Sequence, residues 1–280
     1  MKKGINIWSF PGDMKVADCI DLAVDAGFEG IELALNETGE LSLASKESEI
    51  REYQKRASDA GIELTSLASG LYWTYSLTSS ESHTRDKAKN IVKKQLEAAA
   101  ILGVDTILVV PGAVGVDFIP DSEAVPYDKA YDLALEALSE LAKEAQSVGV
   151  SIGIENVWNK FLLSPLELRD FIDKINSDYV GAYFDVGNVL YAGYPEHWIS
   201  ILDKRIKKVH FKDYRREAGG LSGFVDLLAG DVNYPVVVKA LHAIGYDDYV
   251  IAEMIPTYKH HAKQIVYNTS GSMDAILGRK

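Results

Sequence analysis

Four short apolar segments in the second half of the chain end in residues that can bind a metal ion or move a proton. These residues are Glu155, Asp185, His210 and Glu253, separated along the chain by 30, 25 and 43 positions. Taken singly, each has an ordinary explanation, such as a turn for Asp185 or a buried core position for His210. Three carboxylates and one imidazole gathered at one place would repel one another unless a cation lay between them. The pattern therefore predicts a site for one divalent metal ion.

The types of the four side chains bear on which ion would bind. Three oxygen ligands and one nitrogen ligand suit Mn²⁺, Mg²⁺ or Co²⁺ better than they suit structural zinc. Mn²⁺ is our first choice, and Zn²⁺ stays open as an alternative. Cys19 is the only cysteine, so a cysteine-rich zinc module and an internal disulfide framework are excluded.

A repeated pattern indicates the elements that position these residues. Four times, a helical segment ends in a small residue and a glycine, which are followed by a short apolar run; the runs are 28–33, 62–67, 104–110 and 150–154. Glycine after a helix supplies a left-handed cap, and short β-branched runs are typical of buried strands. The runs at 4–8, 180–184, 206–211 and 248–252 resemble them. Eight strands are therefore expected.

Amphipathic helices are expected between the strands, at 46–60, 85–102, Tyr127–Val148 and 166–175, the last with Ser164 as its N-cap. Eight strands alternating with about eight helices predict an α/β fold of the (β/α)₈ TIM-barrel type, a single domain over residues 1–280. Its active site would lie where the strands end. A doubly wound sheet is the alternative, but residues 9–13 lack the glycine-rich turn that such sheets carry after the first strand.

Composition narrows the class of partner. The chain has 280 residues with 29 basic and 41 acidic side chains, a formal net charge of −12. This balance argues against a broad surface for nucleic acid or anionic membranes, because phosphates are bound by clustered lysine and arginine. No stretch approaches the ~18 consecutive apolar residues of a membrane span, and the N-terminus does not read as a signal peptide. We expect a cytoplasmic protein that acts on a small molecule.

Taken together, the strand ends resemble those of the xylose isomerase-like TIM-barrel superfamily. The matching sequences are Gly-Ile-Glu-Asn at 153–156, Phe-Asp-Val-Gly-Asn at 184–188, Val-His-Phe-Lys-Asp at 209–213 and Ala-Glu-Met at 252–254. The branch most similar in pattern contains L-ribulose-5-phosphate 3-epimerases, also called hexulose-6-phosphate isomerases. There the sixth strand likewise ends in Asp-Val-Gly-Asn, and a Gly-x-Val-Asp segment, here 223–226, precedes the last helix and strand.

The resemblance implies an isomerase of carbohydrate metabolism. Glu155, Asp185, His210 and Glu253 would bind one divalent metal, which acts as a Lewis acid on a ketose carbonyl. Glu155 and Glu253 would also exchange a proton with the neighbouring carbon through an enediolate. Transfer on opposite faces gives epimerisation, and transfer by one base on one face gives aldose–ketose isomerisation. The substrate would be a sugar or a sugar phosphate, most simply a ketose phosphate epimerised at C3. Related barrels often pair, so a homo-oligomer is also expected.

Residues near the strand ends are candidates for substrate contacts. Asn188 stands where many free-ketose epimerases of the superfamily carry histidine, which favours a sugar phosphate. Arg215 and Arg216 follow the seventh strand, where the family often has an arginine on the substrate. Glu32 at the end of the second strand could bind a hydroxyl, and Trp8 and Trp158 could pack on the apolar face of a sugar. The glycine-rich stretch 219–223 could hold a phosphate.

Three other functions fit parts of the pattern. A dehydratase acting on inosose or dehydroshikimate would use the same metal to expel hydroxide. A non-catalytic barrel that binds sugar would keep the site without the reaction. Nucleic-acid repair, as in endonuclease IV, is disfavoured by the acidic charge and by Asn188.

Overall fold

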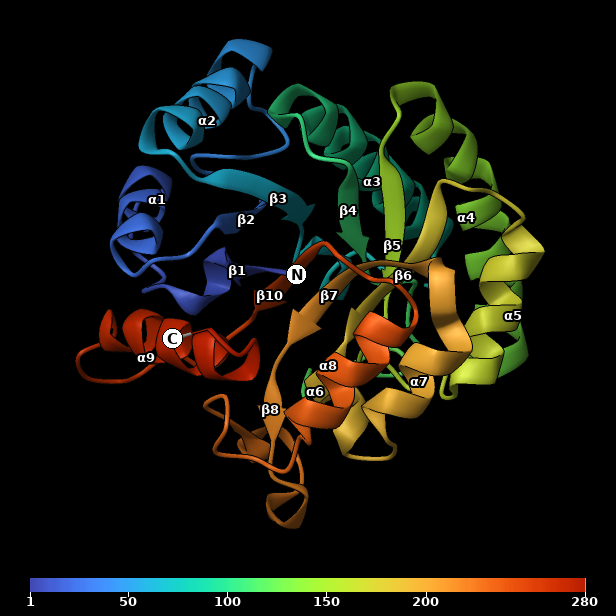
Figure 1. The fold of residues 1–280 in the computed structure, drawn as a ribbon. Helices are drawn as coiled ribbons and strands as arrows, with labels where there is room; N and C mark the ends of the chain where they lie inside the picture. Colours follow the sequence, from blue (N-terminus) through green and yellow to red (C-terminus); the bar gives the residue numbers. More distant parts are fainter. Residues whose placement is uncertain (280) are drawn as a thin grey trace.

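Eight parallel strands close into a barrel in the computed structural model, which describes residues 1–279 (Figure 1). Around the barrel the strands follow the order β1, β10, β7, β6, β5, β4, β3, β2, so each pairs with its neighbours in sequence among the barrel strands. The predicted TIM-barrel class is confirmed. The barrel strands are β1 Lys2–Asn6, β2 Gly30–Ala34, β3 Glu63–Ala68, β4 Thr106–Val109, β5 Ser151–Glu155, β6 Val180–Asp185, β7 Ile206–Phe211 and β10 Tyr249–Ala252.

Helices connect the strands and surround the barrel on its outside (Figure 1). Neighbouring helices in this outer layer pack on one another, as α7 does on α8 and on α5. The helices are α1 Val16–Asp25, α2 Glu47–Ala60, α3 Ser82–Leu102, α4 Tyr127–Val148, α5 Pro165–Ile175, α6 Val186–Leu190, α7 Pro195–Leu202, α8 Tyr234–Ala243 and α9 Gln264–Ile276. Short 3₁₀ turns lie at Ile7–Ser9, Leu71–Trp73, Asp203–Arg205, Arg216–Ala218 and Leu221–Gly223.

The helix ends form as the sequence predicts. Gly61, Gly103 and Gly149 follow α2, α3 and α4 with φ of 75°, 78° and 72°, in the left-handed region that glycine adopts without a steric cost. The Ser164 hydroxyl accepts a hydrogen bond from the backbone N–H of Glu167 and caps α5. The three glycines thus end α2, α3 and α4, and Ser164 begins α5.

Two local features differ from the expectation. Trp8, expected in the first strand, lies in the 3₁₀ turn Ile7–Ser9, because the Asn6 side chain accepts a hydrogen bond from its N–H and ends the strand. Residues Asp213–Tyr214 and Phe224–Val225 form β8 and β9, a small antiparallel pair that was not predicted. In Figure 1 the segment around β8 projects from the barrel.

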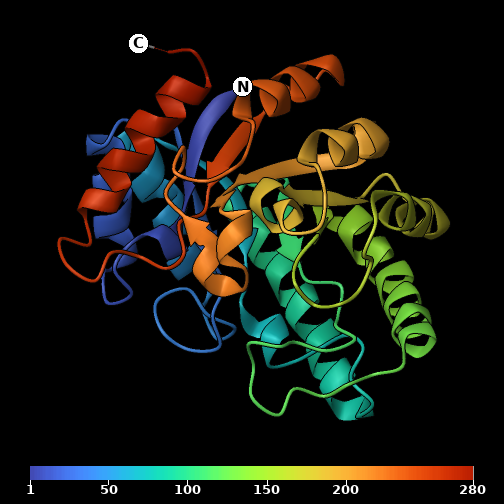
Figure 2. The same ribbon diagram turned by 90° about the horizontal axis from the view of Figure 1, so that it is seen from below.

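The long connections after β4 (green) and β10 (red) lie at the end of the barrel opposite to the N-terminus (Figure 2). Most of the buried apolar side chains lie between the barrel and its helices, whereas a second, smaller cluster that includes Tyr183 and Tyr249 fills the inside. Within residues 1–279, no helix is both long and apolar enough to cross a membrane.

Candidate metal and active site

The four residues predicted to bind a metal lie together at the carboxyl end of the barrel. Glu155 and Asp185 are the last residues of β5 and β6, His210 lies in β7, and Glu253 directly follows β10. Each offers one ligand atom, and these four atoms all lie within 4.8 Å of one another. All four side chains are buried. The closed barrel brings them together because parallel strands end at one rim.

Three buried atoms of this cluster find no hydrogen-bond partner of acceptable geometry among the described residues: Asp185 Oδ2, His210 Nδ1 and Glu253 Oε2. His210 Nδ1 lies 3.1 Å from Glu253 Oε2 and 3.8 Å from Asp185 Oδ2. Buried polar atoms are normally paired, and leaving them unpaired is costly. The Lys212 ammonium lies 2.6 Å from Glu253 Oε2 and 3.3 Å from Asp185 Oδ2 but does not reach the histidine nitrogen as a partner, whereas a metal ion between the three atoms would satisfy all of them. The donor set therefore fits a divalent metal ion.

In the turn after β6, one carboxylate oxygen of Asp185 accepts a backbone hydrogen bond and the other faces the cluster. Its Oδ1 accepts the backbone N–H of Asn188 at 2.7 Å and caps α6, which leaves Oδ2 facing the cluster. Gly187 lets this turn pass close to the segment after β7. A Cβ at position 187 would lie 2.4 Å from Lys212 Cβ and 3.0 Å from its carbonyl oxygen. The Asp-Val-Gly-Asn sequence thus orients the Asp185 carboxylate and lets the turn pack closely against the segment after β7.

Glu32, which was predicted to contact the substrate, lies beneath the cluster, inside the barrel. The side chain is 0% exposed. Its oxygens accept hydrogen bonds from Asn6 Nδ2 and from the hydroxyls of Ser66 and Tyr183, and its Oε1 lies 2.7 Å from His210 Nε2. Burial raises the pKa of Glu32, but His210, Tyr183 and Asn6 outweigh burial and lower it. We infer that the carboxylate is ionised and accepts a hydrogen bond from the Nε2–H of His210.

Lys212, which the sequence reasoning did not single out, lies beside the cluster. Its Nζ is 2.6 Å from Glu253 Oε2 and 3.3 Å from Asp185 Oδ2, and the side chain is nearly buried. Burial raises the pKa of Glu253, but Lys212 and His210 reverse this and lower it to about 2. The signal that would have found Lys212 is its position two residues after His210, since alternate residues of a strand face the same side.

Glu155 has a different environment from Glu253. Burial raises the pKa of Glu155 to about 8, with Glu253 and Asp185 acting in the same direction and Lys212 against them. Asn188 Nδ2 lies 3.4 Å from Glu155 Oε1 and donates to the backbone oxygen of Asn156. Glu155 and Glu253 both face one cavity of about 600 Å³, which we call the inner cavity. Of the predicted substrate contacts, Asn188, Trp8 and Trp158 also line it.

Arg215 and Arg216, which were predicted to contact the substrate, do not line this cavity. Arg215 Nη2 donates to the backbone oxygen of Ala229. Arg216 donates from Nε to Leu190 O and from Nη2 to Gly193 O, and its guanidinium lies over the Tyr194 ring. Both side chains therefore hold loops together. Of the glycine-rich stretch 219–223, Ser222 and Leu221 reach the cavity, but no arginine accompanies them among the described residues.

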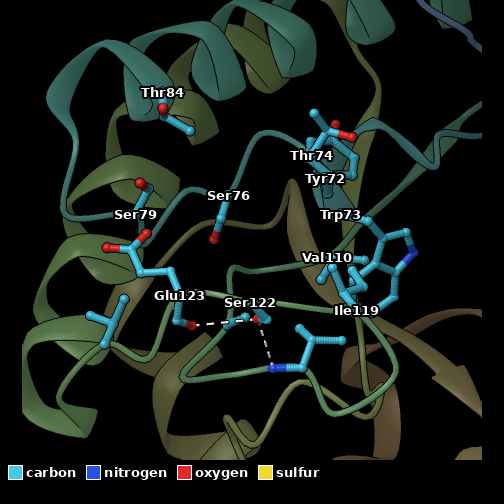
Figure 3. Close-up of a pocket in the computed structure, with 13 residues that line it drawn as sticks. Tyr72, Trp73, Thr74, Ser76, Ser79, Thr84, Val110, Ile119, Ser122 and Glu123 are labelled. Carbon is cyan, nitrogen blue, oxygen red and sulfur yellow. Dashed lines mark hydrogen bonds between the residues drawn. The ribbon is translucent and has the colours of Figure 1, made fainter.

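A smaller cavity of about 130 Å³ lies between the segments after β3 and β4 (Figure 3). Ser122 lines this cavity, and its hydroxyl accepts a hydrogen bond from the backbone N–H of Val116. Trp73 and Val110 line both this cavity and the inner one. None of the four clustered residues lines the small cavity. The small cavity is therefore a neighbour of the candidate site and not part of it.

Comparison with known proteins places this geometry in context. A curated relative, an uncharacterised protein of Methanocaldococcus jannaschii, is 27% identical over 168 residues, which are 58% of this chain. The aligned region spans only 55% of that relative's length. This chain is therefore similar to about half of that relative, whose name gives no function.

Solved structures match over nearly the whole chain. D-psicose 3-epimerase of Clostridium cellulolyticum, solved with D-tagatose, superposes with a TM-score of 0.82 at 17% identity and covers 99% of both chains. An IolI protein with a bound zinc atom gives 0.81 at 18% identity, covering 99% of this chain and 98% of the other. At this identity the likeness shows the fold. The sequence model described as the xylose isomerase-like TIM barrel matches residues 20–268, so the chain belongs to that family.

Proposed function

We propose that the protein is a divalent-metal-dependent sugar epimerase or isomerase that moves a proton at the carbon next to a ketose carbonyl. The observation that carries the proposal is the pair Glu155 and Glu253, which enter one cavity from β5 and β10 with Asp185 and His210 between them. Two carboxylates on two sides of a bound sugar can remove a proton on one face and return one on the other. The 3-epimerase among the similar folds agrees with this reaction class.

We assign the metal to Glu155, Asp185, His210 and Glu253, and we propose Mn²⁺, because the ligand set has three oxygens and one nitrogen. When bound, a divalent ion withdraws electrons from the carbonyl and makes the neighbouring C–H more acidic. The chain's own residues do the remaining work. Glu155 and Glu253 hold and release the proton, Lys212 places a positive charge beside Glu253, and Trp8 and Trp158 wall the cavity.

The structure changes our preference about the substrate. The expectation of a sugar phosphate relied on Asn188, Arg215 and Arg216 and on the glycine-rich stretch. Both arginines bind loop carbonyls, so a phosphate in the cavity would lack its expected partners. We therefore propose that the reacting sugar is an unphosphorylated ketose. We also propose that the protein works in the cytoplasm, because a chain with a single cysteine has none of the internal disulfides that are common in proteins of oxidising compartments.

The test is a screen of ketopentoses, ketohexoses and their phosphates with the Mn²⁺-loaded protein in deuterated water. We expect one unphosphorylated ketose to yield its epimer or aldose isomer with deuterium at the reacting carbon. A deoxy-dicarbonyl product would identify a dehydratase instead. Sugars that bind but never exchange a proton would contradict the proposal and indicate a sugar-binding barrel.

A further inference from the structure

A second hollow lies beside the inner cavity and shares part of its lining. This hollow, which we call the outer groove, has a volume of about 960 Å³, compared with about 600 Å³ for the inner cavity. Phe118, Val157, Trp158, Asn188 and Leu221 line both. Ligand cavities commonly span about 300–1,000 Å³, so the inner cavity alone has room for a monosaccharide. The outer groove adds more space than the proposed ketose would use.

The outer groove is aromatic and apolar, and much of this surface faces solvent. The exposed fractions are 59% for Tyr191, 55% for Tyr194, 65% for Leu163 and 51% for Leu166. Large apolar side chains that gather in one exposed concave surface usually mark a binding site. Aromatic rings are suited to sugars because they present an apolar face and, in tyrosine, a polar hydroxyl at the edge.

Trp158 stands at the junction of the two hollows and is held rigidly. Its Nε1 donates to the backbone oxygen of Asn188 at 2.9 Å. Its ring packs against Tyr191, Tyr214 and Phe224, with centroid separations of 5.4, 5.4 and 5.2 Å. A wall fixed in this way loses little conformational entropy when a ligand binds. Trp158 and Tyr191 thus form a platform that begins where the inner cavity ends.

Charge limits what the platform can hold. Among the described residues that line the two hollows, the lysine and arginine side chains are Lys212, which is paired with Glu253, and Lys160, which is paired with Asp117. Phosphate recognition in proteins depends on free cationic donors or clustered N–H groups. The groove therefore does not favour a phosphate next to the reacting sugar, and it does favour a neutral ring.

We propose that the substrate is a ketose that carries a second sugar ring through a glycosidic bond, with the ketose in the inner cavity and the second ring on the Trp158–Tyr191 platform. This inference rests on the proposed function and specifies its substrate class. It accounts for the size of the groove, for its aromatic lining and for the residues that it shares with the cavity of Glu155 and Glu253. It also accounts for the pairing of each lysine in the described lining with a carboxylate. The ketone stays free for the proton transfer, because the glycosidic bond is made through another oxygen of the ketose.

The inference is tested by binding of matched probes, which needs no turnover. The probes are D-fructose, D-fructose 6-phosphate and three glucosyl-fructoses with free ketones, namely isomaltulose, maltulose and turanose, linked at O6, O4 and O3. We expect at least one disaccharide to bind about tenfold more tightly than fructose and fructose 6-phosphate, measured by calorimetry on the Mn²⁺-loaded protein. Affinities that do not exceed that of fructose, or tightest binding of the phosphate, would overturn the inference.

Variants separate the platform from general effects on the fold. Tyr191→Ala should remove most of the preference for the disaccharide over fructose. The control is Tyr267→Ala, another exposed tyrosine, which lies on α9 and lines neither hollow; it should keep the preference. If Tyr191→Ala instead dissociates a dimer without changing the preference, the groove is an interface between two copies and the inference is wrong.

The two proposals fail in different ways. If disaccharides bind through Tyr191 but no sugar exchanges a proton, the proposed reaction is refuted and the second-ring site remains. If fructose exchanges its proton and the disaccharides bind no better, the reaction is supported and the second-ring site is refuted.

Discussion

His210 Nε2 lies 2.7 Å from Glu32 Oε1, and this contact joins β7 to β2 across the inside of the barrel. Because Glu32 occupies one ring nitrogen, the other nitrogen, Nδ1, faces Asp185 and Glu253. Metal-binding histidines are generally oriented in this way by a carboxylate on their far nitrogen. Glu32 therefore acts on the candidate metal site from beneath and does not need to touch the substrate.

The first prediction concerns Glu32→Gln, which keeps the shape of the side chain but removes its charge. We expect Mn²⁺ affinity to fall about 10-fold or more, because carboxylate partners of metal-binding histidines contribute a factor of about 10–100. Glutamine is preferred to alanine, since it keeps a hydrogen-bond acceptor for His210 Nε2 and leaves no cavity in the buried interior. Calorimetric titration measures the affinity. Glu63→Gln on β3, where the side chain is exposed, is the control; equal affinities for the two variants would refute the role of Glu32.

The second prediction is that Lys212→Met changes metal affinity and turnover in different ways. Lys212 Nζ lies close to two oxygens of the proposed metal site, and like charges repel. Removing the ammonium group should leave Mn²⁺ affinity unchanged or raise it, while turnover falls about 100-fold, the usual cost of losing a positioned charge or donor. Lys207→Met, on β7 with its Nζ donating to Asp178 O, is the control. Parallel losses of affinity and turnover would indicate that Lys212 is only structural.

The third prediction concerns Gly187→Ala, which places a Cβ against Lys212. Overpacking of this kind costs about 1–3 kcal/mol, so urea unfolding of the metal-free protein should show lower stability. Mn²⁺ affinity should fall as well, since the displaced turn carries Asp185. Gly271→Ala on α9 has no atom within 4 Å of the new Cβ and should not destabilise the protein. A stable Gly187→Ala protein with normal affinity would contradict the proposed close packing.

The fourth prediction concerns the reactivity of Cys19 on α1, which is 1% exposed. Burial raises the pKa of its thiol to about 12, and only the thiolate reacts quickly. The native protein should resist a thiol reagent at mildly alkaline pH and react only when unfolded. Between the ordinary thiol pKa and about 12, the folded state keeps a proton that the unfolded chain has lost, so stability should fall as pH rises. Rapid labelling of the native protein would contradict the burial of Cys19 and the raised pKa of its thiol.

Much of the fold can be predicted from the sequence because its signals are local. The glycines after α2, α3 and α4 adopt the left-handed conformation that they indicate, and α4 spans Tyr127–Val148 as its periodicity predicts. The convergence of Glu155 and Glu253 with the other two residues also follows, since it needs only the barrel and the positions where strands end. The pair β8 and β9 was missed because each strand has two residues, too few to show a period.

Side-chain partners are harder to predict because they depend on contacts across the barrel. Glu32 and His210 are 178 residues apart and meet only when β2 and β7 face each other inside the barrel. Arg215 and Arg216 were placed near the substrate from their position after β7, but the loop folds so that backbone carbonyls receive their donors. A position along the chain does not determine the direction in which a long side chain points.

The central claim, that Glu155 and Glu253 exchange the proton, is tested most directly by deuterium uptake from solvent into a bound ketose. The measurement compares the wild-type protein with Glu155→Gln and Glu253→Gln, each loaded with Mn²⁺ and checked for bound metal and for folding. We predict exchange at the carbon next to the carbonyl in the wild type and a loss of epimer formation in both variants. Epimer formed with deuterium at the wild-type rate by both variants would contradict the account.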